Sequence, residues 1–94
     1  MIYVCDFSIS FDNEVEDVTL YNDDFTEDQV KDFLKSIVDD KKIPIGERCE
    51  GSIRVDDDFI EVESKFCSNV GEDWDTDDWS EMEKVKLNRE SYDM

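Results

Sequence analysis

Apolar and polar side chains alternate along the first eleven residues of the chain. Tyr3, Cys5, Phe7, Ile9 and Phe11 share one face, and the residues between Cys5 and Phe11 on the other face are acidic or carry hydroxyls. Alternation over this length predicts a strand with one buried face.

A second strand is predicted from Val15 to Leu20, after the turn-forming residues 12–14. The apolar step from Val15 to Val18 breaks the two-residue period, so we expect a β-bulge near Glu16 and Asp17. Because the connection is short, the two strands should form an antiparallel hairpin.

A helix is predicted to begin after Thr26. Thr26 can cap its first turn while Gln29 reaches back to the cap, and Phe25 can pack against Val30 as a hydrophobic staple. Apolar residues then recur at helical spacing on one side, and the pattern ends near Asp39 and Asp40. This stripe consists of Val30, Phe33, Leu34, Ile37 and Val38.

A second hairpin is predicted from Ile53 to Phe66, with its turn at Asp56, Asp57 and Asp58. Val85 and Leu87 indicate a last short strand, and residues 71–81 are too acidic for a core element. The fold class expected is α+β, a four- or five-stranded, mostly antiparallel sheet with one amphipathic helix packed on one face.

Length and composition fit a single domain, residues 1–94, that folds although it is highly charged. Leu, Ile, Val and Phe make up 25 of the 94 residues, enough for a small core. There is no histidine, which excludes imidazole-based triads and His-ligated metal sites. The three cysteines are widely spaced, as is typical of reduced thiols, and we expect them to be buried or inert.

The net charge of −18 comes from 28 acidic and 10 basic residues, and it is unevenly spread. Residues 1–30 hold nine acids and no base, residues 31–55 hold five acids and six bases, and residues 56–94 hold fourteen acids and four bases. If strands of the first and last thirds pair, one surface should be almost entirely carboxylate. This charge predicts no direct binding to nucleic acid or to an anionic membrane.

The candidate partner-binding residues are carboxylates of the last third together with two tryptophans. Alternate residues of an extended chain lie about 6 to 7 Å apart, close to the spacing of phosphates along a nucleic-acid strand. Tryptophans supply the large aromatic anchors that protein interfaces favour. The set is Asp56, Asp57, Asp58, Glu61, Glu63, Glu72, Asp73, Trp74, Asp75, Asp77, Asp78, Trp79 and Glu81.

The sequence predicts no enzyme, no cofactor and no metal site. Asp73, Asp75 and Asp77 are spaced like the first ligands of a calcium loop, but Asp78 stands where the turn glycine belongs and Lys84 where the bidentate glutamate belongs. Neither a signal peptide nor a membrane span is expected, and a cytoplasmic location is predicted, in the host cell if a phage encodes the chain.

In size, charge and character the chain resembles the acidic nucleic-acid mimics of phages and mobile elements, of the anti-CRISPR and anti-restriction type. No motif is shared, so no residue role is carried over. The resemblance implies an inhibitor that occupies the nucleic-acid-binding groove of a CRISPR effector, restriction enzyme or nuclease. Two alternatives remain open: an immunity or antitoxin-like protein that neutralises a basic toxin, and an acidic interaction module without mimicry.

Overall fold

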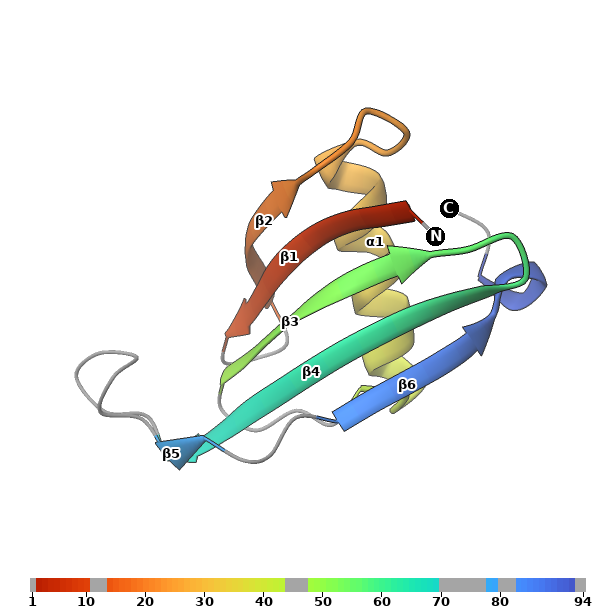
Figure 1. Cartoon of the computed structure of the whole chain (residues 1–94). Helices are drawn as coiled ribbons and strands as arrows, with labels where there is room; N and C mark the ends of the chain where they lie inside the picture. The colour runs from red at the N-terminus through yellow and green to blue at the C-terminus, as the bar shows by residue number, and fades with distance from the viewer. Residues whose placement is uncertain (1, 11–13, 44–47, 70–77, 80–82, 93–94) are drawn as a thin grey trace.

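The described residues of the computed structural model are 2–10, 14–43, 48–69, 78–79 and 83–92. They form one sheet with a helix across one face (Figure 1). In chain order the elements are β1 (Ile2–Ser10), β2 (Glu14–Leu20), α1 (Glu27–Asp39), β3 (Arg48–Val55), β4 (Phe59–Asn69), β5 (Asp78–Trp79), β6 (Glu83–Asn88) and the 3-10 helix η2 (Arg89–Ser91).

The strands are antiparallel and follow the order β2-β1-β3-β4. The outer side of β4 takes two successive neighbours, β6 along residues 59–64 and β5 at residues 67 and 69. The sheet is therefore five positions wide, with β2 at one edge (Figure 1). The predicted α+β class, the antiparallel sheet and the single packed helix are confirmed for the described residues.

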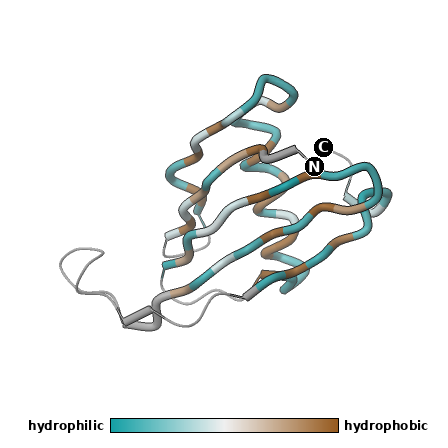
Figure 2. The backbone as a smooth tube through the Cα atoms, viewed as in Figure 1, coloured by the Kyte–Doolittle hydropathy of each residue, from teal (hydrophilic) through white to brown (hydrophobic). Residues whose placement is uncertain are grey.

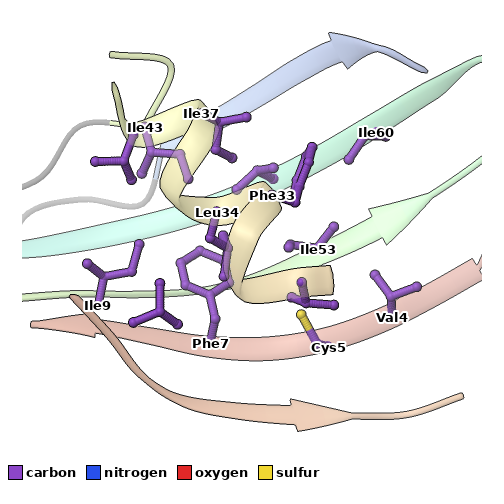
Figure 3. Close-up of a cluster of buried hydrophobic side chains, with 14 of the residues drawn as sticks. Val4, Cys5, Phe7, Ile9, Phe33, Leu34, Ile37, Ile43, Ile53 and Ile60 are labelled. Carbon is purple, nitrogen blue, oxygen red and sulfur yellow. The ribbon is translucent and has the colours of Figure 1, made fainter. Parts of the chain in front are cut away.

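Helix α1 begins and ends where the sequence predicts. The Thr26 hydroxyl accepts a hydrogen bond from the Gln29 N–H at 3.2 Å, and the Gln29 side chain accepts one from the Thr26 N–H at 2.9 Å. All five residues of the predicted apolar stripe are buried. They pack on the side chains that β1, β3 and β4 direct toward the helix (Figure 3).

The sheet face under α1 forms a single hydrophobic cluster in the described part of the chain. Hydropathy alternates along the strands, so brown and teal positions follow one another in Figure 2. The bulge predicted near Glu16 is present, because the register of β1 with β2 shifts between Ser8 and Ile9. Both predicted hairpins are also confirmed.

The strict alternation predicted for residues 2–11 is wrong at Val4. A register shift between Tyr3 and Cys5 inserts Val4 as an extra residue opposite β3, and Val4 and Cys5 are both buried. A bulge places two consecutive residues against one on the partner strand, so side chains that would alternate can both face the core. Phe11 lies outside the described residues.

The C-terminal end of α1 is closed by two backbone hydrogen bonds, Lys41 N–H to Val38 O at 2.9 Å and Lys42 N–H to Ile37 O at 2.8 Å. This is the Schellman pattern, which favours glycine at the position after the cap. Lys41 occupies that position with φ 58°. A side chain in this left-handed region costs about 1 kcal/mol.

We expect Lys41→Gly to raise the free energy of unfolding by roughly 0.5 to 1 kcal/mol, because glycine removes the strain at positive φ. Lys42→Gly removes the same charge at a position without positive φ and should lower stability instead. Urea denaturation of the two variants compares them directly. Equal effects of both substitutions would contradict the strain at Lys41.

Gly51 on β3 has no room for a side chain beside β4. A Cβ at this position would lie 2.0 Å from the Glu63 carbonyl oxygen and 2.8 Å from the Phe7 ring. Only a residue without a side chain allows the backbone of β3 to come this close to β4 while the Phe7 ring covers it.

Gly51→Ala should lower the free energy of unfolding by about 3 kcal/mol, since the added methyl group has to push β3 and β4 apart. Ser52→Ala, one residue along the same strand, should change stability by less than about 0.5 kcal/mol. Thermal and urea unfolding measure both. An unchanged midpoint for Gly51→Ala would refute the close approach.

Candidate partner-binding surface

Asp56, Asp57 and Asp58 form the turn between β3 and β4, as the sequence predicts. The Asp56 carboxylate accepts a hydrogen bond from the Asp57 N–H at 2.8 Å, and the Asp56 carbonyl accepts one from Arg89 Nη1 at 3.0 Å. Asp57 and Asp58 are exposed at the rim of an open hollow that residues 88–90 complete. Two of the three predicted carboxylates are therefore free to face a partner.

Glu61 and Glu63 lie on the sheet face opposite α1, two residues apart on β4 as predicted, but their charges are balanced there. The Arg54 guanidinium contacts both carboxylates. Lys84 Nζ lies 2.9 Å from Glu63 Oε1, and Lys86 Nζ lies 3.8 Å from Glu61 Oε2. Only 8% of Glu61 is exposed. These two carboxylates stabilise pairing of β3, β4 and β6 and add little uncompensated charge to the surface.

The ion pairs with Lys84 and Arg54 lower the pKa of Glu63. The hydrogen bond from Lys84 lowers this pKa most, and the Arg54 charge lowers it further against the opposing effect of burial. Ionised Glu63 is thus more favourable in the folded chain than in the unfolded one. The resulting stability is present above the ordinary pKa of 4.5 and is lost as the pH falls below it.

We expect Lys84→Gln to raise the pKa of Glu63 toward 4.5 and to move acid unfolding to higher pH. Lys86→Gln removes the same charge from the same strand. Because Lys86 pairs with Glu61, this substitution should shift the pKa of Glu63 less. Titration of the side-chain carboxyl carbon of Glu63 by NMR measures its pKa in both variants. The idea fails if Glu63 titrates identically in the two variants.

The predicted acidic segment is described only in part. Glu72, Asp73, Trp74, Asp75, Asp77 and Glu81 lie outside the described residues. Asp78 and Trp79 form β5, whose backbone pairs with Asn69 and Cys67 at the end of β4. The partner-binding role of this segment stays a prediction, as does its partial match to a calcium loop.

The first and last thirds of the sequence do not pair with each other among the described strands. β3, from the middle third, lies between β1 and β4. The sheet face opposite α1 consequently carries both signs of charge, including the Lys65 to Glu50 ion pair at 2.7 Å. The expectation that paired strands of these two thirds create one carboxylate surface is therefore wrong.

Uncompensated charge gathers instead at the edge formed by β2, the turn after it and the first turn of α1 (Figure 1). We call this region the acidic edge. It holds seven exposed carboxylates and one cationic residue, Lys31. The seven are Glu14, Glu16, Asp17, Asp23, Asp24, Glu27 and Asp28.

Lys31 lies close to carboxylates of both β2 and α1. Its Nζ lies 2.8 Å from Glu27 Oε1. The hydrogen bond to Glu27 is the largest cause of its raised pKa, and the charges of Asp28 and Asp17 raise that pKa further. Carboxylates from β2 and from α1 therefore act on the same ammonium group, so the two elements contribute to one negative region.

Tyr21 supplies an aromatic ring at the end of β2. It is 54% exposed, the one large hydrophobic residue so exposed in the described part of the chain. Its hydroxyl donates to Asp6 Oδ2 at 2.6 Å, and its N–H donates to the Val4 carbonyl at 3.0 Å. The hydrogen bond to Asp6 raises the pKa of Tyr21. The ring is thus held in place beside the carboxylates of the acidic edge.

The candidate set from the sequence includes neither Tyr21 nor the acidic edge. The available signal was the run of nine acids without a base in residues 1–30, which the candidate set did not use. The described cysteines agree with the prediction of inert thiols. Burial raises the pKa of Cys5 and of Cys49 to about 12, so both thiols are protonated at neutral pH.

Neither a metal site nor a membrane-spanning helix is found among the described residues. No group of three acidic or cysteine side chains is placed to hold a metal ion there. No helix there has the length and apolar character needed to cross a membrane.

Comparison of the chain with protein-family models, curated proteins and solved structures gives no match. Function is therefore inferred from the residues of this chain alone.

Proposed function

We propose that the protein is a stoichiometric inhibitor that occupies the nucleic-acid-binding groove of a basic protein, such as a CRISPR effector, a restriction enzyme or another nuclease. The observation that carries the proposal is the acidic edge, where seven exposed carboxylates are accompanied by one lysine. A groove that binds phosphates holds counterions, which carboxylates at similar spacing can displace.

The distribution of charge supports this function better than the total charge does. Cations on β3, β4 and β6 neutralise carboxylates on the open sheet face. In the acidic edge one lysine accompanies seven carboxylates, so a negative potential extends from one side of the molecule. A directed field of this kind raises the association rate with a positively charged groove and disfavours partners of like charge.

Inhibition then takes place by occlusion. The carboxylates attract the groove, the exposed Tyr21 ring packs against cationic side chains, and the bound nucleic acid is excluded. No bond is made or broken. The proposal retains the exposed Asp57 and Asp58, in the turn before β4, and the acidic segment at residues 72–81 as further partner-binding residues.

The proposal is tested by competition. The protein should displace fluorescently labelled DNA from a purified CRISPR effector or restriction enzyme, measured by anisotropy, and its affinity should fall steeply between 50 and 300 mM salt. Poly-glutamate at equal carboxylate concentration should compete far less well, because it lacks the fixed arrangement. The proposal would be overturned if the protein did not displace nucleic acid from the basic proteins that co-purify with it.

Matched variants locate the surface. Glu14→Gln/Asp17→Asn/Asp23→Asn removes three charges from the acidic edge and should weaken binding at least tenfold. Asp32→Asn/Asp39→Asn/Asp40→Asn removes three exposed charges from the later part of α1 and its C-cap, and should change affinity by less than about threefold. Reversing Asp73, Asp75, Asp77 and Asp78 to Lys tests the acidic segment. Equal losses in the two triple variants would mean that only net charge matters.

A further inference from the structure

β2 is an edge strand whose outer side has no neighbour in the part of the chain that the structure describes. It pairs with β1 on its inner side. The Tyr21 N–H donates to the Val4 carbonyl of β1 at 3.0 Å, and the register continues with Thr19 opposite Asp6. Inward groups alternate with outward ones in an antiparallel ladder. The N–H and C=O groups of Val18 and Leu20 therefore point away from β1.

The charges on β2 decide which strand can join this side. Glu14, Glu16 and Asp17 are exposed, and β2 contains no basic residue. A second copy of β2 would bring like charges together, and the bulge at Glu16 interrupts regular pairing at the start of the strand. Identical chains are thus disfavoured at this edge, whereas a cationic strand is favoured.

We propose that the outer side of β2 binds an extended, lysine- or arginine-rich segment of the partner protein as an added strand. This inference rests on the proposed function and gives its binding mode. Val18 and Leu20 supply two N–H and two C=O groups for backbone pairing. Cationic side chains of the added strand meet Glu14 and Asp17 at the end of the ladder before Val18. They meet Asp23 and Asp24 beyond the other end, after Leu20.

Tyr21 extends the site at the end of the ladder. Its exposed ring is fixed by hydrogen bonds from the hydroxyl to Asp6 and from the N–H to Val4. A guanidinium or ammonium group that projects from the end of the added strand can lie over this ring and beside the Asp23 carboxylate. Backbone pairing supplies affinity, and the alternation of charge along the segment supplies selectivity.

The test uses two peptides of equal charge. Lys-Val-Lys-Thr-Lys-Val-Lys can extend and pair, whereas Lys-Pro-Lys-Pro-Lys-Pro-Lys keeps the four lysines but cannot form a regular ladder. Binding of each to the ¹⁵N-labelled protein is followed by NMR titration and amide hydrogen exchange at 50 mM salt. We expect at least tenfold tighter binding of the first peptide, and at least tenfold slower exchange of the Val18 and Leu20 amides.

Several outcomes overturn the inference. Equal affinities with unchanged exchange at Val18 and Leu20 would show attraction by charge without strand addition. Protection of these amides in a dimer of the free protein would assign the edge to a second copy. The proposed function fails separately, if the protein does not displace DNA from basic proteins. Displacement of DNA without protection at Val18 and Leu20 leaves that function standing and removes only strand addition.

Discussion

The small number of cations determines where this protein can pair its charges, because only ten basic side chains are present for 28 carboxylates. The fold places Arg54, Lys65, Lys84 and Lys86 on the open face of the sheet, where they pair with glutamates on adjacent strands. Strand pairing at the centre is thereby freed from repulsion. Most other acids of the described residues lie on β2, in turns and on α1, where solvent and salt screen them.

Local features of the fold were predictable because neighbouring residues determine them. The capping box at Thr26, the apolar stripe of α1, both hairpins and the bulge at Glu16 follow from spacing along a few residues. The bulge at Val4 was not predictable in this way. It arises from the register of β1 against β3, which lie about fifty residues apart in the sequence.

The candidate surface was harder to predict, because charge balance depends on strand order. Glu61 and Glu63 have the predicted spacing, but their cations arrive from β3 and β6. The alternation of Lys84 and Lys86 matched that of the two glutamates and was a usable signal. The acidic edge was visible in the sequence as an excess of acids, and only the edge position of β2 gives that excess a direction.

The eleven residues of β4 extend past the region that β6 covers, so the outer side of this strand serves two neighbours in succession. The second neighbour, β5, touches the sheet at two backbone positions only. Neither of these neighbours takes part in the pairing of β1 with β2, of β1 with β3 or of β3 with β4. The junction between these two neighbours can therefore change in length or sequence while the strands under the helix keep their register.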